Sequence, residues 1–97
     1  MHRTVPVSIP ADHPSLAGHF PGQPVVPGVV VLDRVLAAIE VAHGPLGGLR
    51  LPQVKFMRPL LPEQAATIAL EGERPRWRFK VLHADGALIA SGEVVAA

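Results

Sequence analysis

The sequence contains no cysteine and no tyrosine, and only 4% of its residues are aromatic. Without cysteine there is no disulfide framework, no thiolate nucleophile and no thiolate metal site. The longest nearly apolar run, from Val25 to Leu32, contains Pro27 and Gly28 and is too short to span a bilayer. The start of the chain leads into alternating residues rather than a long apolar segment. We therefore expect no signal peptide, no membrane partner and a cytoplasmic protein.

An excess of charge of one sign is also absent, because the formal net charge is only +1. This balance favours neither nucleic acid nor a membrane surface, although it excludes neither, and we expect no nucleic acid as a partner. The five histidines show no HxH or HExxH spacing, so we expect no metal site. What the chain does have is apolar residues, 48% of 97, which suffices for one core and predicts a single domain over residues 1–97. A domain this small leaves much surface wet, which favours self-association.

Alternating apolar and polar residues predict strands at both ends of the chain. The first strand is expected from Thr4 to Ile9 at a sheet edge, because Pro6 has no N–H to donate. Residues 10–26 hold so many prolines and glycines that we expect a stiff loop. Asp85-Gly86 is typical of a tight hairpin. The remaining predicted strands are Gly48 to Leu60, Ala65 to Glu71, Arg76 to His83 and Ala87 to Val95.

One long helix is expected from Pro27 to about His43, ended by Gly44 and Pro45. The valines at 29–31 favour a strand, but the length of the run and the Gly-Pro stop favour a helix. This helix is apolar on nearly every side, which is typical of a buried helix. The predicted architecture is therefore α+β, with an antiparallel sheet wrapped around one long central helix.

Two side chains are candidates for proton transfer. A histidine side chain can act as a base and then as an acid in one turnover, which makes His19 a candidate; alternatively, it is a loop histidine that bonds a nearby carbonyl. Asp33 lies inside the helix with no lysine or arginine one turn away. It is either an unpaired carboxylate among apolar residues or part of a solvent-facing polar stripe that includes Arg34 and Glu40.

Backbone amides and basic side chains supply further candidates. The N–H groups of Gly28 and Val29 have no partner inside the helix and point along the positive end of its dipole, as an oxyanion hole requires. Gly28 can equally relieve crowding after Pro27, and both roles are compatible. The strand at 76–83 carries alternate basic residues on one face, which is either solvated surface or a site for an acidic partner. The basic candidates are Arg58, Arg76, Arg78 and Lys80.

Two segments together resemble a known family. The motif His19-Phe20-Pro21-Gly22-x-Pro24-x-x-Pro27-Gly28-Val29, followed by Asp33, resembles the active site of the hotdog-fold 3-hydroxyacyl-acyl-carrier-protein dehydratases. The segment Val54 to Pro62 resembles the strand that follows their central helix. The resemblance implies a hotdog fold and elimination of water from a 3-hydroxyacyl thioester carried by acyl carrier protein.

The resemblance also implies a role for each residue. His19 would be the catalytic histidine, held by Phe20, Pro21 and Gly22. Asp33 would be the second catalytic residue, an aspartate in the branch of the family that also isomerises its product. The Gly28 amide would bind the thioester carbonyl. The family needs no metal or organic cofactor and builds each site across a homodimer, with the histidine and the acid from different subunits.

The chain departs from the family in length and in the helix. It is shorter than the usual dehydratase, and Arg34, Glu40 and Val41 stand where the family has small or polar residues. The short dehydratase-like proteins of aryl-polyene pigment clusters are candidate closer relatives. Two other functions stay open at this point: a hotdog thioesterase, which needs an acid and a backbone N–H but not the histidine loop, and a non-catalytic hotdog subunit. The basic residues named above are candidates for docking the acidic carrier.

Overall fold

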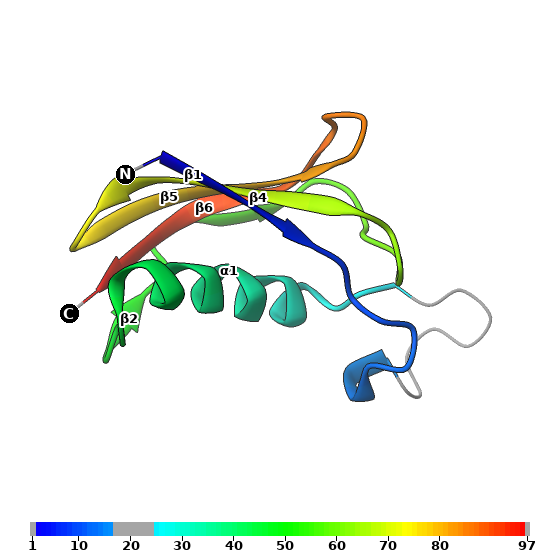
Figure 1. Ribbon diagram of the computed structural model, residues 1–97, viewed down its shortest axis with the longest axis horizontal. Helices are drawn as coiled ribbons and strands as arrows, with labels where there is room; N and C mark the ends of the chain where they lie inside the picture. Colours follow the sequence, from blue (N-terminus) through cyan, green and yellow to red (C-terminus); the bar gives the residue numbers. More distant parts are fainter. Residues whose placement is uncertain (1, 17–24, 97) are drawn as a thin grey trace.

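The computed structural model describes residues 2–16 and 25–96. In this part of the chain an antiparallel sheet carries one helix against one of its faces, as Figure 1 shows. The strand order is β1-β4-β5-β6-β2, and β3 also pairs with β6. The predicted α+β architecture is therefore confirmed. The strands are β1 (His2–Val7), β2 (Leu49–Arg50), β3 (Val54–Phe56), β4 (Ala66–Glu73), β5 (Arg76–His83) and β6 (Leu88–Ala96).

The predicted edge strand and hairpin are confirmed with small shifts. Strand β1 pairs only with β4, so Pro6 lies at a sheet edge as expected. It ends two residues earlier than predicted, and Ile9 instead lies fully buried beyond it. At the hairpin, Gly86 has a φ of 90° and donates its N–H to the carbonyl oxygen of His83.

The single strand predicted from Gly48 to Leu60 was wrong. Two short strands, β2 and β3, replace it, and both pair with β6. Pro52 lies between them, and because it has no N–H it cannot continue a hydrogen-bonded ladder. The chain bends at Pro52, between the two strands.

The helix α1 (Gly28–His43) forms as predicted, with Pro27 as its N-cap residue. At its C-terminus the Gly44 N–H donates to the carbonyl oxygen of Glu40 at 2.8 Å. No helix in the described residues is long and apolar enough to cross a membrane. The side chains that it buries lie on one face, toward the sheet: Val30, Val31, Val35, Ala38 and Ile39.

The expectation that the whole helix is buried was wrong for the single protomer. Val29 is 71% exposed and Val41 is 78% exposed. One sheet covers only one side of a helix, so the opposite side needs another cover or stays in water. The exposed surface of the helix therefore combines these two valines with the charged residues Asp33 and Glu40.

On the sheet side, β5 alternates as the sequence predicts. Trp77, Phe79 and Val81 are buried, whereas the basic residues between them are exposed. The ring of Phe79 lies across Gly92, its partner on β6, where a Cβ atom would meet the ring at 2.9 Å. A Cβ atom there would also lie 2.3 Å from the carbonyl oxygen of Gln53, so a side chain at position 92 would clash with the backbone as well as with the ring.

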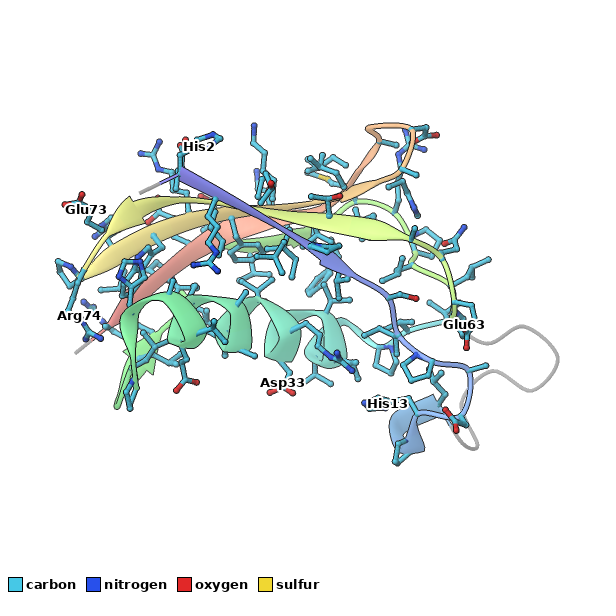
Figure 2. All side chains as sticks on the ribbon, viewed as in Figure 1. His2, His13, Asp33, Glu63, Glu73 and Arg74 are labelled. Atoms are coloured by element: carbon cyan, nitrogen blue, oxygen red, sulfur yellow. The ribbon has the colours of Figure 1, made fainter. Side chains whose placement is uncertain are left out.

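An arginine fixes the C-terminal end of the helix. Arg74, in the turn between β4 and β5, donates Nη2–H to the carbonyl oxygens of His43 at 3.3 Å and Pro45 at 3.2 Å. Its guanidinium lies 5.7 Å from the centre of the buried Trp77 ring, which also contacts the His43 ring. Figure 2 shows Arg74 at this end of the helix. The far end of α1 is thus tied to the sheet.

Candidate active site at the start of the helix

Part of the predicted site lies outside the described residues, namely His19, Phe20, Pro21 and Gly22. The segments on either side of them are described. They are the turn η1 (Pro14–Leu16) on one side and the stretch leading into α1 on the other. The described part of the site consists of the start of α1 and the residues that pack around it.

The amides of Gly28 and Val29 open the helix. The first amides with a described acceptor are those of Val30 and Val31, which donate to the carbonyl oxygen of Pro27 at 3.0 and 3.4 Å. Within the described residues, no acceptor bonds the N–H groups of Gly28 or Val29. Pro27 provides no side-chain cap. Two amides at the positive end of the dipole are thus oriented to bind an oxygen atom with partial negative charge.

Phe56, from β3, covers the start of the helix. A Cβ atom at Gly28 would lie 2.8 Å from Cζ of the Phe56 ring, closer than real contacts allow. Gly28 therefore leaves room for the Phe56 ring, a contact that the sequence analysis did not anticipate. The sequence analysis did not single out Phe56, because nothing in the local pattern connects two residues that far apart in the chain.

An apolar groove of about 490 Å³ lies beside this contact. It is open to solvent at the point where the helix begins, and Gly28 forms part of its wall. Such a groove can accept an apolar ligand that extends away from the two amides. Its lining includes Val25, Val26, Val31, Phe56, Met57, Leu60 and Ile89, with Arg58 at the same site.

Asp33 faces away from the sheet. Figure 2 shows its carboxylate on the outer side of the helix, and the residue is exposed. It forms no ion pair with another described residue. The interpretation of Asp33 as a carboxylate buried among valines is wrong for the single protomer, because its helix position points it outward, one turn after the exposed Val29. Glu40 is exposed as well, as the alternative of a solvent-facing stripe predicted.

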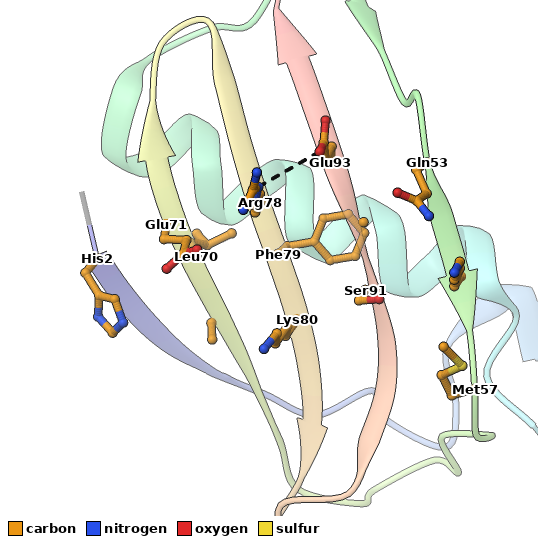
Figure 3. Close-up of a pocket in the computed structure, with 13 residues that line it drawn as sticks. His2, Gln53, Met57, Leu70, Glu71, Arg78, Phe79, Lys80, Ser91 and Glu93 are labelled. Carbon is orange, nitrogen blue, oxygen red and sulfur yellow. Dashed lines mark ion pairs between the residues drawn. The ribbon is translucent and has the colours of Figure 1, made fainter.

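The four basic candidates do not share one surface. Arg58 lines the groove beside Gly28. Arg78 and Lys80 lie on the outer face of the sheet, on the opposite side from the helix (Figure 3). Arg76, two residues before Arg78 on β5, is exposed on the same face. There Arg76 and Arg78 both form ion pairs with Glu93.

The family follows from comparison with known proteins. A family model described as ApeI-like, for the ApeI dehydratase, matches residues 2–93. This chain belongs to the ApeI-like dehydratase family. The membership confirms the resemblance found in the sequence, and it covers nearly the whole chain.

Individual relatives agree with this family. The chain is 30% identical over 97 residues to a 3-hydroxyacyl-[acyl-carrier-protein] dehydratase FabZ of Gluconacetobacter diazotrophicus, covering 86% of this chain and 60% of that protein. It is also 30% identical over 103 residues to the FabZ of Myxococcus xanthus, covering 92% of this chain and 67% of that protein. The chain thus spans roughly three fifths to two thirds of these curated relatives.

A solved structure confirms the hotdog fold. The dehydratase heterocomplex ApeI:P from Xenorhabdus doucetiae contains a chain that matches with a TM-score of 0.82 at 21% identity. The match covers 97% of this chain and 85% of that chain. The ApeI-like protein described here therefore has the sheet-and-helix arrangement that the resemblance implied.

Proposed function

We propose that this protein is a dehydratase that removes water from a 3-hydroxyacyl thioester to give the trans-2-enoyl thioester. The observation that carries the proposal is the pair of amides at Gly28 and Val29, which lie one helical turn before Asp33 and beside an apolar groove. An acyl thioester is complementary to these features. Its carbonyl oxygen can accept from the amides, its α and β carbons react next to that carbonyl, and its apolar chain can lie in the groove. Membership of the ApeI-like family supports the same reaction.

The proposed mechanism assigns each proton to a named group. The thioester carbonyl oxygen accepts the Gly28 N–H, which stabilises the enolate that forms in the transition state. His19 removes the proton from the α carbon, and the C–O bond to the β hydroxyl breaks. Asp33 gives its proton to that hydroxyl, which leaves as water. A proton then returns from the His19 imidazolium to the Asp33 carboxylate, so both groups are restored without a cofactor or metal.

A second copy of the chain would complete the site. An exposed carboxylate is a poor proton donor at neutral pH, because water stabilises its charged form. A homodimer that covers the outer face of the helix would remove this water and bring His19 of one protomer to Asp33 of the other. The helix also exposes two apolar side chains, Val29 and Val41, which a second copy of the chain could cover.

The open edge of the sheet at β3 also supports self-association. Met57 donates its N–H to the carbonyl oxygen of Ile89, and Gln53 accepts from the N–H of Glu93. Since these residues alternate in an antiparallel ladder, the backbone groups of Val54 and Phe56 point away from β6. An unpaired edge beside the exposed Phe56 and Met57 fits a copy of the same edge related by a twofold axis.

The proposed thioester carrier is acyl carrier protein, the carrier in the name of the FabZ relatives. Arg58 is the best placed of the four basic candidates, because it lies at the groove that would receive the acyl chain. Arg76, Arg78 and Lys80 lie across the sheet from that groove, and a carrier bound there would not reach it directly.

The direct test is to supply a 3-hydroxyacyl thioester and follow the absorbance of the enoyl product. We expect the wild-type protein to form the enoyl thioester and the His19→Ala variant to lose at least 100-fold in rate. Release of free thiol without enoyl product would identify a thioesterase instead. Equal rates for wild type and His19→Ala would show that the histidine loop is not catalytic.

A second candidate function is that of one subunit in a mixed complex. The Xenorhabdus relative was solved as a heterocomplex, and Asp33 is exposed in the protomer described here. Under this hypothesis the isolated chain is inactive, and adding a second hotdog protein restores turnover. Dehydration by the purified chain alone, as a homodimer, would exclude it.

A further inference from the structure

Two lysines flank one serine on the outer face of the sheet, the face opposite the helix. Lys80 of β5 and Lys55 of β3 both lie directly opposite Ser91 of β6 in the antiparallel register. Side chains that lie directly opposite one another share a face of the sheet, and Lys80 alternates with the buried Phe79 and Val81. Figure 3 shows Lys80 and Ser91 on this face. We refer to Lys55, Lys80 and Ser91 as the lysine row.

The lysine row contains no acidic residue. Beyond Lys80 the next residue across the sheet is Ala69 of β4, and neither lysine forms an ion pair with any residue among 2–16 and 25–96. The acids of this face lie in the adjacent row, where Arg78 lies between Glu71 and Glu93 and pairs with Glu93. The two positive charges of the lysine row are therefore not neutralised by a described carboxylate.

The spacing of the strands brings the two ammonium groups within reach of one ligand. Adjacent strands lie about 4.8 Å apart, so β3 and β5 are separated by roughly 10 Å with β6 between them. Each lysine has a flexible four-carbon stem, so both ammonium groups can extend over Ser91. In the described part of the chain the Ser91 hydroxyl has no hydrogen-bond partner, and the residue is half-buried. Like charges repel at this range, and an anion held between them replaces that repulsion with attraction.

The lysine row also lines a hollow in the outer face of the sheet. The hollow has a volume of about 540 Å³, is open to solvent and reaches from His2 of β1 to Gln53 beside β3. A phosphate group fills only part of this volume, so there is also room for a small organic group attached to it. The hollow therefore offers a ligand both a charged centre and space around it.

We propose that the lysine row binds a phosphate group, either free or carried on a small organic molecule. A phosphate dianion matches the charge of two lysines, and its oxygens accept from both ammonium groups and from the Ser91 hydroxyl. A carboxylate carries a single charge and leaves one lysine unmatched. The site lies across the sheet from the groove at Gly28, so it does not depend on the proposed dehydratase activity.

Titration with inorganic phosphate at constant ionic strength tests the proposal, with the backbone amide NMR signals of Lys55, Lys80 and Ser91 as the readout. We expect these signals to shift and to saturate. The double variant Lys55→Gln with Lys80→Gln should raise the dissociation constant at least about tenfold, because it removes two charged donors. The matched control is Arg3→Gln with Arg50→Gln, which removes the same net charge outside the hollow and should change the constant by less than about twofold.

Glycerol phosphate, titrated in the same way, distinguishes the two sources of the phosphate group. Tighter binding than that of inorganic phosphate would identify a phosphate ester as the ligand, and equal or weaker binding would identify free phosphate. Shifts that do not saturate would overturn the proposal. So would equal shifts with sodium chloride at the same ionic strength, or equal dissociation constants for the lysine and arginine double variants.

Discussion

The ring of Phe56 lies directly against the backbone of Gly28, at a distance that leaves no room for a Cβ atom. The contact joins the first residue of the helix to the last residue of β3. Because the two residues also line one groove, the size of residue 28 determines the position of the Phe56 ring and with it the shape of the groove. Gly28 therefore has two roles: it leaves room for the Phe56 ring, and its N–H is available to bind an oxygen atom of a ligand.

We predict that Gly28→Ala lowers the rate of dehydration at least tenfold while it destabilises the protein by only about 1 kcal/mol. The alanine would push the Phe56 ring outward, and a half-exposed ring can move at modest cost. The displaced ring would then obstruct the groove. Urea unfolding and steady-state rates on the same preparations measure the two effects.

Phe56→Ala supplies the control for that contact in a double-mutant cycle. With the ring removed, Gly28→Ala should no longer destabilise the protein and should stabilise it slightly, since alanine favours the helix. An equal loss of stability in both backgrounds would mean that Phe56 does not restrict position 28.

For Asp33→Asn we predict loss of activity without loss of stability. In the single protomer Asp33 is exposed and forms no ion pair with a described residue, so the free energy of unfolding of the monomer, measured below the dimer dissociation constant, should change by less than about 0.5 kcal/mol. The rate should fall at least 100-fold, because asparagine cannot give a proton to the leaving hydroxyl. Glu40→Gln, exposed on the same helix, is the matched control and should keep the wild-type rate. Similar rates for both variants would exclude Asp33 as the acid.

The β3 edge gives a prediction about self-association. Met57→Glu places a charge on a 53% exposed side chain at this edge and should raise the dimer dissociation constant at least tenfold, about 1.4 kcal/mol. Sedimentation equilibrium over a range of concentrations measures the constant. Thr4→Glu, on the opposite edge strand β1, should leave it unchanged. If Thr4→Glu weakened the dimer and Met57→Glu did not, the contact would lie at the β1 edge and the prediction would be wrong.

At the other end of the helix, Arg74→Ala should reduce stability by about 1 kcal/mol. The substitution removes two hydrogen bonds, to the carbonyl oxygens of His43 at the end of the helix and of Pro45 beyond it, and a contact with the Trp77 ring. Urea unfolding provides the measurement. Arg3→Ala, exposed on β1, should change stability by less than about 0.5 kcal/mol. Equal effects would mean that the arginine does not hold the helix end.

Arg58→Glu tests the docking of the carrier. We expect KM for a thioester carried on acyl carrier protein to rise about tenfold, because the reversed charge repels an acidic partner. For the same acyl group on a small thiol, KM should not change. Lys80→Glu, on the outer face of the sheet, should affect neither substrate. A rise in KM for Lys80→Glu alone would move the docking site to that face.

The sequence was sufficient for most of the fold because the decisive signals are local. Strict alternation from Arg76 to Val81 predicted the strand at 76–83, whose bounds are unchanged, and the Gly44-Pro45 stop predicted the end of the helix. The Asp85-Gly86 turn was also predicted, since its conformation depends on two adjacent residues. The break at Pro52 was missed although its signal is also local, since a proline has no N–H to continue a hydrogen-bonded ladder.

What only the tertiary structure decided is which residues meet and which face water. Apolar periodicity left the surroundings of Asp33 open, because a helix that is apolar all round does not reveal which side the sheet covers. The contact of Phe56 with Gly28, and that of Glu63 with Ala11, join residues 28 and 52 positions apart in the chain. Local residue preferences carry no information across such separations, so tertiary packing decides which residues form the site. The sequence by itself determines which chemical groups those residues supply.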